Sequence, residues 1–381
     1  MESTPMDIDD APSAAATPSL NITRNLAANV PSTTPISEVI ASFRPTKLFQ
    51  RDDIKEGKPR PYVLSIDFDD PGELCMTSES DETIQIYNVK EGRHDKSLLS
   101  KKYGVKLARF THTSSSIIYA STKQNNAIRY LATHDNSFIR YFEGHEGAVT
   151  DLALHPGADN FISCSVDDTA LIWNISTKQW IGKLFLNAPY LSAWDPSGNV
   201  FAIASLHSGS ILLYDFRNYE KGPFSVFDVL QATRSGPVEP EWAFQGWTKL
   251  EFSNDGKHIL LGSRGDGHFL LDSFDGSLKA YLKKPVAGTN RRAVGEPESV
   301  GNAESSGDCC FAPDGRYVLS GAKSDVLVWD TLQAPGSDKV LKPAHVLEEK
   351  RETAVVAFNP RYNMLATADQ DLMFWVPDPN V

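Results

Sequence analysis

Residues 144–174 read GHEGAVTDLALHPGADNFISCSVDDTALIWN, and this stretch decides the fold. β-Branched, aromatic and other apolar residues predict three strands within it, at residues 149–154, 161–165 and 169–173. The segments between these strands are rich in Gly, Pro, Asn and Asp, which form tight turns. Pro156 ends the first strand, because proline cannot donate to a sheet ladder. The stretch is therefore predicted to fold as an antiparallel meander.

The ending of the third strand recurs along the chain. Tyr87, Tyr130 and Trp173 close three such strands at intervals of 43 residues. Four further endings follow, at residues 211–215, 269–272, 326–330 and 372–376. A period of about 40 residues is typical of β-propellers, in which each repeat forms one four-stranded blade. Seven endings therefore predict an all-β, seven-bladed propeller.

The Gly144-His145 start and the Trp173-Asn174 end resemble the WD40 repeat, in which Asp usually stands at the position of Asn174. Each sheet of a propeller is buried on both faces, so its polar groups must pair with one another. In WD40 repeats an imidazole, a strand hydroxyl, a turn carboxylate and an indole form one hydrogen-bonded chain. The resemblance implies such a structural network here, made of His145, Ser163 (or Ser165), Asp167 and Trp173.

The same His, Ser and Asp are also the residue types of a hydrolase triad. The structural network is favoured because Trp173 and the strand-turn-strand context fit the repeat, and no G-x-S-x-G nucleophile elbow accompanies these residues. The sequence also lacks a phosphate-binding P-loop, an H-E-x-x-H metal motif and a C-x-x-C pair. We therefore expect a non-catalytic protein with no cofactor and no metal, and a propeller enzyme remains the alternative.

Charge and cysteine usage limit the classes of partner. The 381-residue chain carries a formal net charge of −12, which argues against direct nucleic-acid binding through a broad basic surface. The N-terminus lacks the pattern of a signal peptide, and no apolar run approaches the length of a membrane span, so no membrane contact is expected. The four cysteines lie in predicted strands without metal-ligand spacing, which indicates reduced core residues of an intracellular protein: Cys75, Cys164, Cys309 and Cys310.

The composition divides the chain into a tail and one propeller. Residues 1–35 contain few large apolar groups and are predicted to be disordered, whereas residues 36–381 are predicted to form the propeller. Two long intervals between strand endings predict inserted loops near residues 233–241 and 284–308.

The last blade is predicted to need a strand from the other end of the chain. It runs from roughly His345 to Val376 and contains only three strands. An isolated strand at residues 43–49 can supply the fourth, which would join the two chain ends and remove exposed sheet edges.

Several cations fall in the turns before third strands and in the connections that enter first strands, which lie on one face of a propeller. They are Lys101, Lys102, Lys123, Arg264 and Lys323. A basic cluster at this mouth would suit a phosphorylated or acidic peptide, and the alternative is scattered solvated charge. Three aromatic residues are candidate rim anchors or, alternatively, core residues: Tyr103, Tyr141 and Trp247.

Longer segments carry a more specific resemblance. They are SKKYGVKLARFTH at 100–112, IRYLATHDNSFIRYFEGH at 128–145, LYDFRNYEKGPF at 213–224, LEFSNDGK at 250–257 and FWVP at 374–377. From about residue 40 to 378 the chain resembles the WD-repeat subunit shared by the COMPASS histone H3 lysine methyltransferase complex and the nuclear cleavage and polyadenylation machinery.

That resemblance implies a nuclear scaffold with three partners. These are an N-terminal segment of the methyltransferase, a scaffold subunit of the cleavage/polyadenylation and phosphatase complex, and the phosphorylated tail of RNA polymerase II. Among matched positions, the Lys101–Tyr103 connection and the Asn136–Tyr141 segment are the favoured contact sites. A generic WD40 adaptor in RNA processing or ubiquitin ligation is the alternative.

Overall fold

The computed structural model describes residues 34–51, 60–233, 246–284, 308–349 and 351–379. The predicted disordered tail and the two predicted insertions lie almost entirely outside these described residues. No helix in the described part of the chain is long and apolar enough to cross a membrane.

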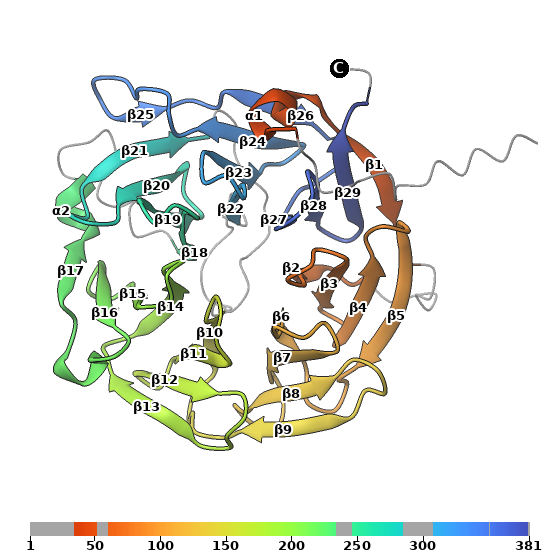
Figure 1. The fold of residues 1–381 in the computed structure, drawn as a ribbon, viewed down its shortest axis with the longest axis vertical. Helices are drawn as coiled ribbons and strands as arrows, with labels where there is room; N and C mark the ends of the chain where they lie inside the picture. Colours follow the sequence, from red (N-terminus) through yellow and green to blue (C-terminus); the bar gives the residue numbers. More distant parts are fainter. Residues whose placement is uncertain (1–33, 52–59, 234–245, 285–307, 350, 380–381) are drawn as a thin grey trace, which may run out of the picture.

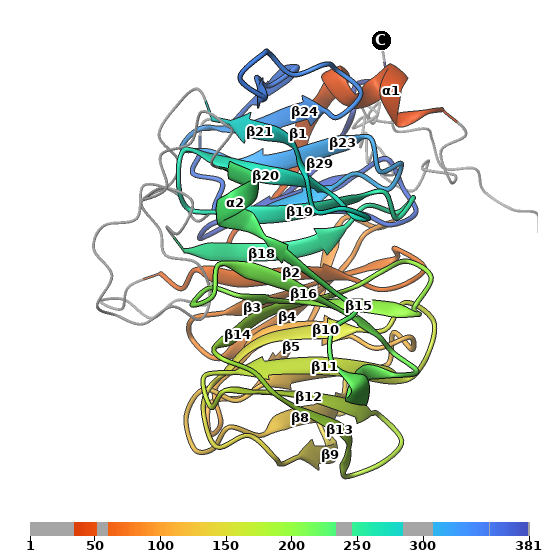
Figure 2. The ribbon, with the colours of Figure 1, turned by 90° about the vertical axis from the view of Figure 1, so that its left-hand side faces the viewer.

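Seven sheets stand around a central axis as the blades of a propeller (Figure 1). In blades 1 to 6 the chain runs outward from the innermost strand, and the first four strands of each blade pair antiparallel with one another. Seen from the side, the strands cross the thickness of the ring from one face to the other (Figure 2). The prediction of an all-β, seven-bladed propeller is confirmed.

The first three blades have four strands each. Blade 1 contains β2 (Val63–Phe68), β3 (Leu74–Glu79), β4 (Thr83–Asn88) and β5 (Arg93–Leu99). Blade 2 contains β6 (Lys106–Phe110), β7 (Ser116–Ala120), β8 (Ile128–Ala132) and β9 (Phe138–Phe142). Blade 3 contains β10 (Val149–Leu154), β11 (Asn160–Ser165), β12 (Thr169–Asn174) and β13 (Trp180–Phe185).

The next three blades repeat this order. Blade 4 contains β14 (Pro189–Trp194), β15 (Val200–Ser205), β16 (Ser210–Asp215) and β17 (Ser225–Asp228), with the short helices η3 (Tyr219–Lys221) and α2 (Val229–Thr233) beside β17 in the chain. Blade 5 contains β18 (Trp247–Phe252), β19 (His258–Ser263), β20 (Gly267–Asp272) and β21 (Leu278–Lys283). Blade 6 contains β22 (Cys309–Phe311), β23 (Tyr317–Gly321), β24 (Asp325–Asp330) and β26 (His345–Glu348).

Blade 7 is completed by the N-terminal strand, as predicted. It contains β27 (Val355–Phe358), β28 (Leu365–Ala368), β29 (Leu372–Pro377) and, on the outside, β1 (Phe43–Phe49), which follows α1 (Ile36–Val39) and η2 (Ile40–Ser42). β1 pairs antiparallel with β29, from Phe43 opposite Pro377 to Phe49 opposite Leu372. The two ends of the chain therefore share one sheet.

The predicted start of blade 7 near His345 is wrong. His345 belongs to β26, which pairs antiparallel with β24 and is the fourth strand of blade 6. Between β24 and β26 the chain forms β25 (Val340–Leu341), which pairs in parallel with β21 and adds a fifth strand to blade 5. A short apolar strand does not reveal in its sequence which neighbouring sheet it joins.

The apolar core lies between the blades. The described buried residues form seven clusters, and each cluster joins two neighbouring blades. Trp247 is fully buried in the cluster between blades 4 and 5, so the interpretation of this residue as a rim anchor is wrong. All four cysteines are buried and free, in agreement with the sequence analysis.

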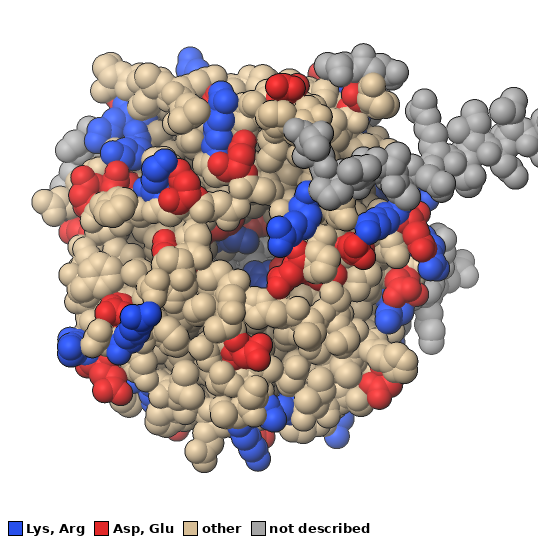
Figure 3. Space-filling view, viewed as in Figure 1, with Lys and Arg blue, Asp and Glu red and all other residues tan. Residues whose placement is uncertain are grey.

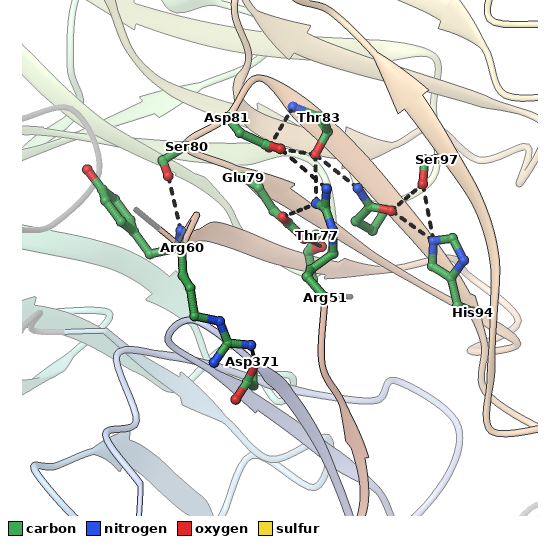
Figure 4. A network of polar contacts seen from close by, with 12 residues as sticks. Arg51, Arg60, Thr77, Glu79, Ser80, Asp81, Thr83, His94, Ser97 and Asp371 are labelled. Atoms are coloured by element: carbon green, nitrogen blue, oxygen red, sulfur yellow. Dashed lines mark hydrogen bonds and ion pairs between the residues drawn. The ribbon is translucent and has the colours of Figure 1, made fainter. Parts of the chain in front are cut away.

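Arg51 extends the closure of the ring into blade 1 (Figure 4). Arg51 lies two residues after Phe49, the last residue of β1. Its guanidinium lies 2.5 Å from Glu79 Oε2 and 3.3 Å from Asp81 Oδ2 of blade 1. Arg60, which precedes the first strand of blade 1, forms an ion pair with Asp371 of blade 7 at 2.8 Å. Charged side chains therefore hold the first and last blades together beside the closing strand.

The closing strand generates a test of stability. Phe43 is fully buried and its ring lies 5.8 Å from that of Phe358, so Phe43→Ala is expected to lower the free energy of unfolding by about 3–5 kcal/mol. Thr46→Ala, at an exposed position of the same strand, is the matched control and should change it little. Chemical denaturation of both variants measures the difference, and equal stabilities would contradict the role given to β1.

Candidate functional site

The four polar residues of blade 3 lie in one hydrogen-bonded chain. His145 Nε2 is 2.7 Å from Ser163 Oγ, and Trp173 Nε1 donates to the same hydroxyl at 2.8 Å. On its other side, His145 Nδ1 is 3.1 Å from Asp167 Oδ2. Ser163 is fully buried, so its hydroxyl is closed to a substrate and the hydrolase alternative loses its nucleophile.

Asp167 is the charged end of this chain. Partial burial raises its pKa, but hydrogen bonds from Thr169 and from the backbone N–H of Glu146, with the nearby His145, bring the pKa down to about 2. Burial lowers the pKa of His145, so its imidazole is neutral at pH 7. The arrangement is a fixed polar support inside the blade.

Other blades depart from this pattern. In blade 7, Trp375 Nε1 donates to Thr367 Oγ1 at 2.8 Å. In blade 6 the hydroxyl of Ser320 meets an imidazole from the neighbouring blade, at 2.8 Å from His268 Nε2 of β20. Sequence analysis missed His268, because a repeat pattern assigns each histidine to its own blade.

The chain of blade 3 generates a second prediction. Asp167→Ala leaves the side chains of His145 and Thr169 and three backbone N–H groups without their acceptor, so we expect a loss of about 1–3 kcal/mol in the free energy of unfolding. Asp159→Ala, at an exposed position of the same blade, is the control. Thermal unfolding compares the two, and an unchanged melting temperature for Asp167→Ala would remove the structural role.

The central channel is lined by charged side chains that the sequence analysis did not single out. It has a cavity volume of about 680 Å³, and Figure 3 shows it as a hollow with Lys or Arg side chains inside. Arg109 and Lys249 are the cations of its lining, and the carboxylates that accompany them include Asp67, Asp151, Glu251 and Asp308. An Asp or Glu recurs in the sequence within or just before these inner strands, and this recurrence could have predicted the charged lining of the channel.

These carboxylates bind the backbone of the next blade. The oxygen–nitrogen distances are 2.7 Å from Asp67 to Phe110, 2.7 Å from Asp151 to Ser192, 3.4 Å from Glu251 to Phe311 and 2.8 Å from Asp308 to Val356. Each bond crosses from one inner strand region to the following blade. The acids therefore serve to join blades, which accounts for their convergence without catalysis.

Asp67 makes stability depend on pH. Burial raises its pKa to about 6, against the opposing effects of Arg109 and of the Phe110 N–H. Because this pKa lies above the value of about 3.9 in unfolded chains, the associated stability is complete below about pH 4 and is lost as the pH rises through 6.

A variant isolates this contribution. Asp67→Asn keeps an oxygen that can accept the Phe110 N–H but cannot titrate. Between about pH 4 and pH 7, we expect wild type to lose about 1 kcal/mol more unfolding free energy than the variant, since solvent in the open channel screens part of the effect. Denaturation at several pH values measures both curves. Parallel curves would contradict the assignment.

Four of the predicted contact residues lie close together between blades 1 and 2. Lys101, Lys102 and Tyr103 occupy the connection from β5 to β6, where the backbone N–H groups of Tyr103 and Gly104 bind the Ser100 carbonyl at 3.0 and 2.7 Å. Gly104 has a φ of +72° and lies against Thr122, so a side chain at this position would collide with Thr122. The Lys123 N–H donates to the Tyr103 carbonyl at 2.9 Å, which fixes this turn beside the connection.

Arg129, which the sequence analysis missed, organises the aromatic residues at this place. Its guanidinium carbon lies 3.4 Å from the ring centre of Tyr103, 4.9 Å from that of Tyr141 and 5.4 Å from that of Phe138. We call Tyr103, Phe138, Tyr141 and Arg129 the aromatic cluster. The sequence signal that could have identified Arg129 is an arginine in the third strand of blade 2 that lies opposite an aromatic residue of the fourth strand.

The guanidinium itself is not displayed to a ligand. Arg129 is 2% exposed, and its nitrogens donate to Ser121 Oγ at 2.8 Å and to Asn125 Oδ1 at 3.0 Å. Stacking on a cation holds an aromatic ring in place. Arg129 is therefore a positioning residue, and the rings around it are the part of the cluster that a partner can contact.

Asn136 and the lysines border the aromatic cluster. Asn136, at a φ of +58°, donates from Nδ2 to the Leu99 carbonyl at 3.3 Å. Lys102 Nζ lies 5.0 Å from the centre of the Tyr103 ring. Lys123 forms an ion pair with Glu82 at 2.5 Å, so part of its charge is already compensated.

Arg264 and Lys323 do not join this group. Arg264 is only 7% exposed, so the expectation that it displays a cation at the mouth is wrong. Lys323 is exposed in the turn between β23 and β24 of blade 6, whereas the aromatic cluster lies between blades 1 and 2. Among the described residues no group of three or more His, Cys, Asp or Glu side chains could hold a metal ion.

Comparison with known proteins adds the family. The WD domain, G-beta repeat model matches residues 136–174 and 299–330. The COMPASS component SWD2 of Saccharomyces cerevisiae is 36% identical over 344 residues, which cover 89% of this chain and 97% of the yeast protein. The chain belongs to the Swd2 family of WD-repeat proteins.

Two further relatives are similar over most of the chain. The Set1 complex component swd2 of Schizosaccharomyces pombe is 30% identical, over 82% of this chain and 92% of its own length. WD repeat-containing protein 82 of Drosophila melanogaster is 34% identical, over 90% of this chain and 96% of its own length. The predicted resemblance to the WD-repeat subunit of the COMPASS complex is confirmed.

Proposed function

We propose that this Swd2-family protein is a nuclear, non-catalytic scaffold subunit of a COMPASS-type histone H3 lysine-4 methyltransferase complex. The observation that supports this most strongly is the similarity over nearly the whole propeller to proteins named as components of COMPASS and of the Set1 complex. The geometry is compatible, since the buried hydroxyl of Ser163 and the channel carboxylates have structural roles.

Contact with the methyltransferase is assigned to the aromatic cluster and its border. Tyr141 is 37% exposed, and Ile139, two residues before it in β9, is 48% exposed. Leu99, whose carbonyl accepts a hydrogen bond from Asn136, is 53% exposed. Aromatic rings held by packing are effective anchors, because little side-chain freedom is lost when a partner binds. An N-terminal segment of the methyltransferase is the proposed ligand.

A second part of the proposal concerns transcription. The same scaffold would serve a cleavage/polyadenylation and phosphatase complex through that complex's scaffold subunit, and would couple both complexes to the phosphorylated tail of RNA polymerase II. The supporting observation is the exposed pair Lys101 and Lys102 next to Tyr103, since lysines pair well with phosphate. No direct contact with nucleic acid is proposed.

Affinity purification tests the assembly. Tagged full-length protein from its own cells should bring down the methyltransferase complex and cleavage/polyadenylation subunits, identified by mass spectrometry. Recovery of the first without the second would reduce the proposal to its methylation part. Recovery of ubiquitin-ligase subunits or of unrelated RNA-processing factors in place of both would favour a generic WD40 adaptor.

Charge reversal tests the lysine pair. Lys101→Glu combined with Lys102→Glu should fold normally, because both side chains are exposed, and should weaken binding of a serine-phosphorylated RNA polymerase II tail peptide by roughly tenfold. Lys178→Glu with Lys221→Glu makes the same change of net charge at exposed sites in blades 3 and 4. Fluorescence anisotropy gives the affinities, and equal losses in the two double variants would mean that only net charge matters.

A further inference from the structure

The outer edge of blade 2 has an unusual composition for an exposed strand. β9 reads FIRYF, and it is the last strand of its sheet in the part of the chain that the structure describes. Its exposed residues include Ile139 and Tyr141, at 48% and 37%. Proteins normally protect such an edge with charged residues or Pro, as β1 does with its FRPTKLF sequence. The one charged residue of β9, Arg140, is half-buried and donates to the Ile175 carbonyl of blade 3. The β9 edge is therefore suited to contact with another strand.

Blade 5 shows that this propeller can extend a blade outward. β25 lies parallel to β21, with Val340 opposite Tyr281 and Leu341 opposite Leu282. The Tyr281 N–H donates to the Lys339 carbonyl at 2.8 Å. Two apolar residues in an extended segment are enough to form this fifth strand, and here the protein supplies them itself.

A second apolar outer strand, β13, is partly covered. It reads WIGKLF, but the Tyr219 hydroxyl of blade 4 donates to the Ile181 carbonyl at 3.0 Å. The same ring lies so close to Gly182 that a Cβ there would be 2.7 Å from it. Within the described residues, no comparable hydrogen bond reaches the backbone of β9 from another blade. The outer edge of β13 is therefore partly occupied by Tyr219, whereas the outer edge of β9 is more open.

We propose that the outer edge of β9 binds an extended segment of a partner protein as a fifth strand of blade 2. This inference rests on the proposed scaffold function and specifies its mode of binding. Main-chain hydrogen bonds to β9 would supply affinity, and alternate side chains would supply specificity. An apolar side chain of the segment lies against the ring of Tyr141, beside Tyr103.

The charges nearby define the rest of the partner. Lys102 Nζ is 5.0 Å from the Tyr103 ring, and that ring is 5.6 Å from Phe138, the first residue of β9. Lys101 is exposed in the same connection. An acidic or phosphorylated residue of the segment is therefore placed toward Lys101 and Lys102. The expected ligand combines alternating apolar residues with a nearby negative charge.

A displayed library provides a defined probe. Random peptides of about ten residues, the length of a long strand, are selected on phage against the purified full-length protein and remade synthetically. Strand addition uses only every second peptide amide at the interface. N-methylation of one alternate set of amides should weaken binding by roughly tenfold or more, whereas methylation of the other set should leave it unchanged. Equal tolerance of both sets would overturn the proposal.

Edge variants locate the binding site on the protein. Ile139→Lys and, as a second variant, Tyr141→Ser should weaken the selected peptide by roughly tenfold, whereas Phe185→Lys on the β13 edge should not. Thermal unfolding verifies that each variant is folded. Selected peptides that bind all three variants equally would overturn the proposal. It would also be overturned if the protein forms a dimer that the β9 variants dissociate while their peptide affinity stays the same.

This test is independent of the affinity purification. It uses the purified chain and synthetic peptides, so failure to recover a methyltransferase complex would count against the proposed function alone. Conversely, full recovery of the complex by Ile139→Lys and Tyr141→Ser, together with unaltered peptide binding, would leave the scaffold function intact and remove β9 as its docking edge.

Discussion

Four of the seven junctions between blades are held, within the described residues, by a side chain that accepts a backbone N–H across the gap. Asp67, Asp151, Glu251 and Asp308 do this around the central channel, and apolar clusters fill the space behind them. A sheet standing on edge cannot bury its faces alone. The ring is therefore stable only when each blade has both neighbours, which makes the pairing of β1 with β29 a condition for all the others.

The dependence of each blade on its neighbours also separates the features that the sequence could predict from those that it could not. Strand periodicity and turn residues identified seven blades and the closing strand, because they are local signals repeated many times. Contacts between blades leave no such signal. The histidine that reaches Ser320 comes from blade 5, and β25 leaves blade 6 to join blade 5. Sequence analysis therefore misplaced His345 by one blade and treated Arg264 as a surface cation.

The candidate contact residues were located in part by the same reasoning. The repeat placed Lys101, Lys102 and Lys123 on one face of the ring, and the family resemblance singled out the Lys101–Tyr103 and Asn136–Tyr141 segments. The structure places these residues near one another between blades 1 and 2. The residue that organises them, Arg129, is buried and lies in a strand, where a search for exposed loop residues does not look. The aromatic rings of this surface stack on a cation that is itself buried, since Arg129 donates to Ser121 and Asn125.

The register of blade 7 has a consequence for the order of the chain. Phe43 at the start of β1 lies opposite Pro377 at the end of β29, so the last and first strands meet as the two arms of a hairpin without its turn. A short peptide joining these positions would give blade 7 the same strand connectivity as blades 1 to 4. The molecule is thus topologically a circle opened at one hairpin, and its termini could in principle be moved to another surface turn with the ring of blades preserved.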